Sequence, residues 1–149
     1  MTEGAEPQSA MQDQIARFIE SVNNGENLLG MLPTTVAEVE GADLVLDLDI
    51  HDRITGPRGA LQGGAIATLA DLVGGRMAMQ GAGADSIVVT TDLSVHYLAP
   101  VMSQTARAIG HVLRRGKRAV TVRVDVYDGV DGPMAAACTL GFRIITPSR

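Results

Sequence analysis

One acidic residue, Asp71, stands in the middle of a segment that is otherwise mostly apolar or small, from Gly63 to Met79. Apolar residues recur there at the spacing of an α-helix, which predicts a helix with one buried face. Burying a lone carboxylate costs several kcal/mol unless the group is paired or hydrogen-bonded. Asp71 is therefore either a solvent-facing residue, alone or paired with Arg76, or a group that transfers protons or attacks a substrate.

The predicted helical neighbours of Asp71 are all small. Ala67, Thr68, Gly74 and Gly75 stand one turn before and one turn after it. Each glycine costs about 1 kcal/mol of helix stability relative to alanine. We interpret these small residues as leaving space beside the carboxylate for a ligand or for another chain.

A pair of glycines, Gly63 and Gly64, begins the same predicted helix about two turns before Asp71. The first N–H groups of a helix have no partner inside it, and the helix dipole favours negative charge there. Glycine also lets a substrate oxygen approach the backbone closely. These amides are candidates for stabilising an oxyanion, and the plainer alternative is a flexible loop that enters a helix.

No other set of residues has the spacing of a known catalytic or metal site. His51, His96 and His111 lack the H-E-x-x-H spacing of a zinc site and are interpreted as surface or edge residues. Cys138 lies among small residues and is predicted to be a buried core residue. The sequence contains no G-x-S-x-G, phosphate-binding loop or dinucleotide fingerprint. No metal is expected.

Basic residues gather in one predicted turn of this acidic chain. They are Arg114, Arg115, Lys117 and Arg118. Most charged turns are only solvated, but guanidinium and ammonium groups are also natural partners for phosphate. Both interpretations stay open.

Periodicity and turn residues place these candidates in an α+β fold. The predicted strands cover residues 34–40, 43–50, 86–97, 104–115, 118–127 and 134–145. A loop rich in glycine and proline covers residues 52–61. Short connections predict a mainly antiparallel sheet, and the long helix at 63–79 must lie against one of its faces.

The N-terminal part differs in character from the rest of the chain. Residues 1–10 are polar and are predicted to be disordered or frayed. A short amphipathic helix follows, predicted by the helical spacing of Met11, Ile15, Phe18 and Ile19. We divide the chain into a tail with this short helix, residues 1–33, and one globular domain, residues 34–149.

The composition excludes several classes of function. A formal net charge of -5 and an aromatic content of 3% argue against binding to nucleic acid or to an anionic membrane surface. One cysteine permits no intrachain disulfide and fits a reducing compartment. The first residues lack the pattern of a signal peptide, and no apolar segment is long enough to span a membrane. A cytoplasmic protein is expected.

Two motifs connect the candidates to a known family. Residues 59–71, GALQGGAIATLAD, resemble the G-x-L-H-G-G-x-x-x-x-L-x-D segment of the phenylacetate-type (PaaI-like) hot-dog thioesterases. Residues 91–100, TDLSVHYLAP, look like that family's strand with its D-L-x-V-x-Y-L-x-P ending. The resemblance covers roughly residues 34–146. It implies a hot-dog fold, in which a mainly antiparallel six-stranded sheet wraps a long central helix.

The resemblance also implies acyl-CoA thioester hydrolysis between the subunits of a homodimer or homotetramer, with no cofactor beyond the CoA of the substrate. By position, Asp71 matches the catalytic carboxylate, which acts as general base or nucleophile. The Gly63 amide matches the group that polarises the thioester carbonyl. Thr90 falls near the position where a Ser or Thr helps to orient the water. The further substrate contacts that we expect are Gly56, Gly64, Arg115, Lys117 and Arg118.

Two positions depart from the pattern of this family. Its usual His before the two glycines is Gln62 here, and its usual Asn six residues earlier is Gly56. Gln62 is expected to be a catalytic-site residue that orients the thioester, by a hydrogen bond to a thioester oxygen or to a neighbouring backbone group, but it cannot carry a proton at neutral pH. A non-catalytic acyl-CoA-binding protein is therefore the first alternative function. A hot-dog hydratase or dehydratase, which generally uses a His with the acid, is the second.

Overall fold

The computed structural model describes residues 7–147. These residues form two compact units, of which the first ends at Met31 and the second begins at Leu32. The boundary predicted from the sequence lies two residues later, between residues 33 and 34.

The first unit is helical. It contains α1, Pro7–Asn23, and one turn of 3-10 helix, η1, Leu28–Met31. The expectation of a frayed tail is wrong for residues 7–10, because a proline is well accommodated in the first turn of a helix; residues 1–6 lie outside the described part. Three members of the predicted apolar stripe on α1 are about half exposed: Ile15, Phe18 and Ile19.

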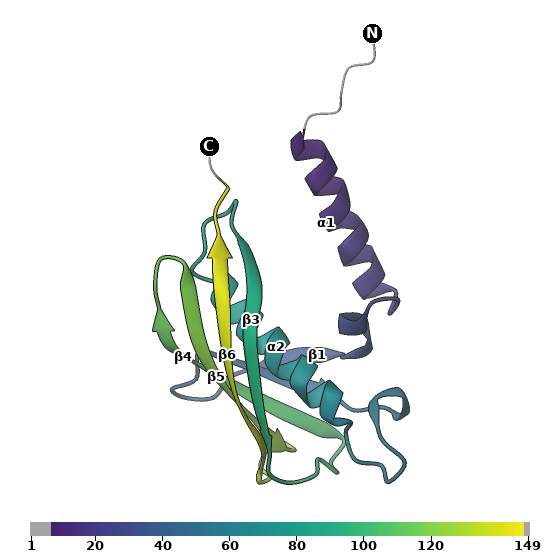
Figure 1. Cartoon of the computed structure of the whole chain (residues 1–149). Coiled ribbons are helices and arrows are strands. Elements are labelled where there is room, and N and C mark those ends of the chain that lie inside the picture. Colours follow the sequence, from purple (N-terminus) through teal and green to yellow (C-terminus); the bar gives the residue numbers. More distant parts are fainter. Residues whose placement is uncertain (1–6, 148–149) are drawn as a thin grey trace. The chain divides into compact units, whose positions relative to one another are not determined.

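The second unit is a six-stranded sheet with one long helix against it (Figure 1). The strands are β1, Thr34–Ala37; β2, Leu44–Asp49; β3, Ile87–Tyr97; β4, Thr105–Arg115; β5, Ala119–Asp128; and β6, Met134–Ile145. Their order across the sheet is β1-β2-β4-β5-β6-β3, and every neighbouring pair is antiparallel. The predicted α+β class is confirmed. β1 is shorter than its predicted range because its pairing with β2 stops at Ala37.

The long helix, α2, runs from Gly63 to Met79, as its periodicity predicts. It packs closely on the sheet, since a Cβ atom at Gly74 would lie only 2.8 Å from the ring of Phe142. The small size of Gly74 therefore serves this packing, and the interpretation that it leaves space for a ligand is wrong. The core side chains that α2 contributes without any exposure are Leu69, Ala70, Val73, Met77 and Ala78.

The loop before α2 is more ordered than its composition suggests. It includes a short 3-10 helix, η2, Asp52–Ile54, and an isolated bridge between Thr55 and Leu61. These contacts fix the point at which the chain enters α2. Within residues 7–147, no helix is long and apolar enough to cross a membrane.

One edge of the sheet is formed by β3, which bonds only to β6. Most of its residues are exposed, and the large apolar ones among them are Ile87, Val89 and Leu93. The register between β3 and β6 shifts between Thr90 and Asp92, so that β3 contains a bulge at Thr91. A long apolar edge of this kind is a template for pairing with another chain.

Candidate active site

The carboxylate of Asp71 is oriented by a hydroxyl group from the edge strand. Thr90 Oγ1 donates to Asp71 Oδ1 over 2.7 Å, and the Asp71 side chain is half-buried on α2. Among the described residues, Asp71 has no other hydrogen bond and no ion pair, so the alternative of an Asp71–Arg76 pair is wrong. The second oxygen, Oδ2, stays open to a substrate or to water.

Thr90 faces Asp71 because of the bulge in β3. Thr90 lies opposite Phe142, whose ring packs against α2, so the Thr90 side chain is on the same face of the sheet. After the extra residue the register resumes with Asp92 opposite Gly141, which places Leu93 opposite the fully buried Leu140. The bulge therefore turns both Thr90 and Leu93 towards α2, although strict alternation would separate them.

The first turn of α2 leaves its amides open. Gln62 occupies the N-cap position, but its side chain makes no capping hydrogen bond. Instead, Gln62 Nε2 donates to the carbonyl oxygen of Thr55 over 3.0 Å, which is the backbone contact that the sequence analysis considered. Gly63 and Gly64 are exposed, and their N–H groups have no acceptor within residues 7–147. Gly56 lies in the loop that Gln62 closes.

Tyr97, the last residue of β3, contacts the same turn. Its hydroxyl donates to the carbonyl oxygen of Gly63 over 2.7 Å. A Cβ atom at Gly63 would lie 3.3 Å from that hydroxyl oxygen and 3.4 Å from the ring carbon that bears it. Tyr97 is not among the site residues predicted from the sequence, because no local signal reports a contact between residues 34 positions apart.

Gly63 and Asp71 lie on one helix but do not meet. They stand eight positions apart, which corresponds to about 12 Å along a helix axis. A carbonyl group is only about 1.2 Å long. One substrate carbonyl therefore cannot contact the Gly63 amide and the Asp71 carboxylate of the same chain.

The basic turn between β4 and β5 lies at the other end of α2. Arg115 donates through Nη1 to the carbonyl oxygen of Ala78 over 3.1 Å and through Nη2 to that of Met77 over 2.6 Å. These bonds satisfy carbonyl groups at the helix C-terminus, where a positive charge is also favourable. Lys117 and Arg118 are exposed. The structure thus separates the basic candidates from the glycines at the helix start.

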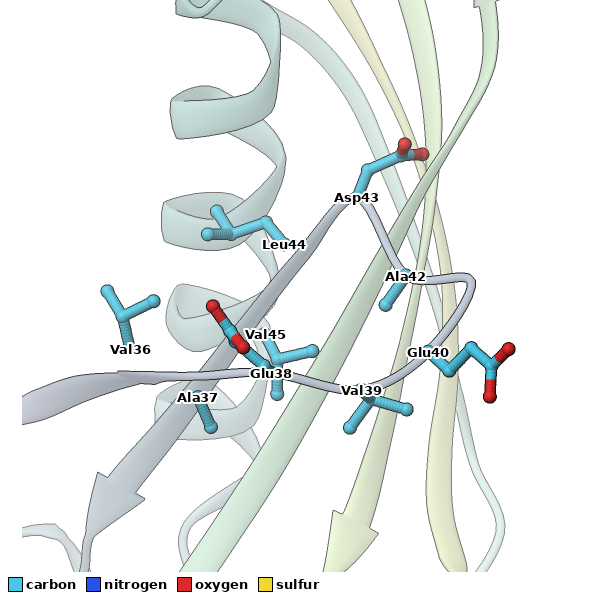
Figure 2. Close-up of a pocket in the computed structure, with 9 residues that line it drawn as sticks. All are labelled: Val36, Ala37, Glu38, Val39, Glu40, Ala42, Asp43, Leu44 and Val45. Carbon is cyan, nitrogen blue, oxygen red and sulfur yellow. The ribbon is translucent and has the colours of Figure 1, made fainter.

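A hollow of about 570 Å³ lies elsewhere, in the hairpin that joins β1 to β2 (Figure 2). Figure 2 shows that its carboxylates, from Glu38, Glu40 and Asp43, point apart. Asp43 Oδ2 accepts the N–H of Val112 over 2.7 Å, so this carboxylate already ties the hairpin to β4. In the described part of the chain, no cluster of three His, Cys, Asp or Glu side chains could hold a metal ion. The full lining is Val36, Ala37, Glu38, Val39, Glu40, Ala42, Asp43, Leu44 and Val45.

The single cysteine is not a nucleophile. The Cys138 side chain is 2% exposed, which confirms the prediction of a core residue. Burial raises the pKa of the Cys138 thiol to about 11. The reactive form of cysteine is the thiolate, so this thiol is inert near neutral pH.

Part of the chain matches a known sequence family. A family model described as the thioesterase superfamily matches residues 58–135. That range includes Asp71, Thr90 and Tyr97. A protein from Saccharolobus solfataricus that is named as an esterase is 27% identical over 126 residues, covering 85% of this chain and 89% of that protein.

Solved structures share the fold. A Haemophilus influenzae thioesterase aligns with a TM-score of 0.73 and 19% identity, covering 85% of this chain and 90% of that one. A Bacillus halodurans protein solved with CoA gives 0.70 and 23%, covering 99% and 98%. A phenylacetic acid degradation-related protein from Ralstonia eutropha gives 0.69 and 22%, covering 85% and 98%. The sheet and its helix are therefore the hot-dog fold that the sequence motifs imply.

Proposed function

Because the chain belongs to the thioesterase superfamily, we propose that it hydrolyses an acyl-CoA thioester to a free acid and CoA. The observation that carries this proposal is the bond from Thr90 to Asp71, which orients a carboxylate on an otherwise apolar helix. A thioester rather than another ester is supported by the superfamily, and CoA is supported by the Bacillus halodurans protein that was solved with it.

In the proposed reaction, Asp71 takes a proton from a water molecule whose oxygen attacks the thioester carbonyl carbon. In the alternative course, Asp71 Oδ2 attacks that carbon itself and water then hydrolyses the mixed anhydride. Either way the C–S bond breaks, the acyl group gains the water oxygen, and CoA leaves as the thiol with a proton from the water. The Gly63 amide donates to the developing oxyanion, an interaction that contributes about 3–4 kcal/mol in comparable sites.

We propose that a complete site joins two copies of the chain. The separation of about 12 Å along α2 makes Gly63 of one copy and Asp71 of the other the natural pair. The unpaired β3 edge supports this arrangement, because a second β3 could add to it and bring a second α2 alongside. A homodimer of this kind, or a homotetramer built from two such dimers, would bury the apolar edge residues.

The basic turn is proposed to bind the phosphate groups of CoA. Lys117 and Arg118 are exposed and free to do so, whereas Arg115 would contribute only the N–H groups that it does not use at the end of α2. Gly56 and Gly64 are proposed to lie against the substrate, since glycine lets its backbone approach a ligand closely. A cytoplasmic location remains a proposal from the sequence.

A thiol-release assay with a panel of acyl-CoAs tests the reaction. The wild type should release CoA, and Asp71→Asn should reduce kcat by about 1,000-fold or more while keeping the melting temperature. Asp85→Asn, in the exposed loop after α2, is the matched control. Full turnover by Asp71→Asn would contradict the assignment. Acyl-CoA binding by the wild type without thiol release would instead favour a non-catalytic binding protein, for which the loss of His at Gln62 is the sequence argument.

Subunit complementation tests the shared site. Gly63→Pro removes one amide, and Asp71→Ala removes the carboxylate, so each variant alone should be inactive. In a mixed dimer, one of the two sites has both groups intact, and random mixing should restore about a quarter of the wild-type activity. No recovery, despite mixed dimers in the preparation, would place both groups in one subunit and overturn the shared site.

A further inference from the structure

We propose that Tyr97 is a positioning residue that holds and polarises the Gly64 amide as a second oxyanion donor. This inference rests on the proposed function and deepens the same site. The Tyr97 hydroxyl donates to the carbonyl oxygen of Gly63 over 2.7 Å. That carbonyl and the N–H of Gly64 belong to one peptide unit, so the bond acts on Gly64.

A hydrogen bond accepted by the carbonyl oxygen makes the N–H of the same peptide a stronger donor, by about 10–30% per bond. The preceding peptide already receives this support, because the Gln62 carbonyl oxygen accepts the N–H groups of Ala65 and Ile66 over 2.9 and 3.1 Å. The N–H of this preceding peptide belongs to Gly63. Tyr97 adds a side-chain donor at the next carbonyl, that of Gly63. The N–H groups of Gly63 and Gly64 are thus both polarised, and they face the same solvent-exposed side.

The surroundings of Gly64 leave room for a substrate oxygen. Gly64 is exposed, and no atom lies within 4 Å of the position that its Cβ would occupy. In contrast, the ring of Tyr97 covers Gly63 on the side where a Cβ would stand. A substrate oxygen can therefore approach the Gly64 amide from open space. The carbonyl of the same peptide is held by the hydrogen bond from Tyr97.

The position of Tyr97 on β3 gives the contact its rigidity. Tyr97 is paired with Ala136 of β6, so its backbone belongs to the sheet rather than to a loop. The same strand carries Thr90, which orients Asp71. One strand therefore fixes both the acid and the amide pair of its own α2.

The test is Tyr97→Phe, which keeps the ring and removes the hydroxyl. Tyr127→Phe is the matched control, because Tyr127 is the other tyrosine of the chain and lies opposite Arg107 on β4. We expect Tyr97→Phe to lower kcat about 3- to 10-fold with KM and the melting temperature unchanged. Tyr127→Phe should leave all three unchanged. Equal kcat for Tyr97→Phe and the wild type would overturn the proposal.

A spectroscopic measurement separates positioning from simple stabilisation. The infrared carbonyl stretch of a ¹³C-labelled acyl-CoA is recorded in Asp71→Ala, which should bind the thioester without hydrolysing it. Hydrogen bonds to the carbonyl lower that frequency. Adding Tyr97→Phe should raise it towards the value of the free thioester. An unchanged frequency together with a lower melting temperature would show a merely structural role and overturn the proposal.

Failure of this proposal is distinguishable from failure of the proposed function. If the wild type hydrolyses a thioester and Tyr97→Phe changes neither kcat nor the carbonyl frequency, only the role of Tyr97 is refuted. If the wild type hydrolyses no thioester, the function is refuted, and polarisation is read from the amide proton shift of Gly64. Tyr97→Phe should move that shift upfield, and no movement would overturn the inference on its own.

Discussion

The two ends of α2 are finished in opposite ways. At the C-terminal end, Arg115 reaches from the sheet and donates to two of the last carbonyl groups. At the N-terminal end, Gln62 makes no side-chain cap, and the amides of Gly63 and Gly64 have no acceptor in the described chain. Unsatisfied backbone groups reduce stability. The closed end contributes to folding, whereas the open end leaves two amides available for the proposed oxyanion of the substrate.

Of the substitutions at the two ends of α2, removing one amide at the open end has the largest expected effect. Gly63→Pro deletes the N–H at the first helical position, where proline is favoured, and Gln62 already has the extended ψ of 139° that a residue before proline needs. We expect kcat to fall about 100-fold or more in the thiol-release assay.

Gly63→Ala is the control for this substitution. It places a Cβ against Tyr97, as the proline would, but it keeps the N–H. It should therefore lose much less activity than Gly63→Pro. An equal loss in the two variants would assign the effect to steric pressure on Tyr97 and would remove the amide from the proposed chemistry.

A smaller effect is expected at the closed end. Arg115→Ala removes two donors from the last carbonyl groups of α2, and hydrogen bonds to charged groups contribute about 1.5–3 kcal/mol each. Because Arg115 is exposed, we expect the free energy of unfolding to fall by about 1–2 kcal/mol, measured by urea denaturation. Arg115→Lys should recover only part of it, since lysine lacks the planar fork. An unchanged unfolding curve for Arg115→Ala would show that this end is not closed in solution.

The Asp128 carboxylate accepts hydrogen bonds from two backbone amides, whereas the first amides of α2 have no acceptor in the described chain. Its Oδ1 accepts the N–H of Ser103 over 2.8 Å and that of Met102 over 2.9 Å, and these bonds, with Ser103 foremost, lower the pKa of Asp128 below its ordinary 3.8. A lowered folded-state pKa stabilises the protein above the unfolded pKa, and the contribution is lost as the pH falls through the folded value. Asp128→Asn should therefore cost about 1 kcal/mol at pH 6 and less at pH 3.

Chemical denaturation at the two pH values measures this difference. Asp85→Asn, in an exposed loop, is the control and should match the wild type at pH 6. A loss in Asp128→Asn that is as large at pH 3 as at pH 6 would contradict a role for the charged carboxylate.

The smallest expected effect is an absence of reaction. The Cys138 thiol is buried and its pKa is raised to about 11, so it should not react with a thiol reagent at pH 8 until the protein unfolds. Counting free thiols with and without denaturant measures this. Rapid labelling of the native protein would indicate that the sheet opens at β6, and it would also add a background to every thiol-release assay.

Local sequence signals predict most of the fold. The bounds of α2 follow from its 3.6-residue periodicity and from the glycines at its start, and the later strands follow from their β-branched residues and turns. The errors lie where local signals are weak, as at the short β1 and at residues 7–10. The unusual position of Asp71 is also visible in the sequence, since it is an acid inside an otherwise apolar helical segment.

The same sequence signals do not identify the partners of the candidate residues. Gly74 illustrates this, because a glycine beside Asp71 suggests open space, while the structure fills that space with the ring of Phe142 from a strand far along the chain. Arg115 illustrates it too, since a basic turn suggests a phosphate site and the guanidinium instead contacts the end of α2.

Short-range residue patterns predict most of the helix and strand segments and the acid within the apolar helix, because both properties depend on neighbours within a few residues. The contacts of Thr90 with Asp71 and of Tyr97 with Gly63 are visible only in the folded chain. Those contacts depend on the pairing of β3 with β6 and on one extra residue at Thr91. A bulge changes which face every later side chain occupies, and no local sequence pattern in this strand predicts the bulge.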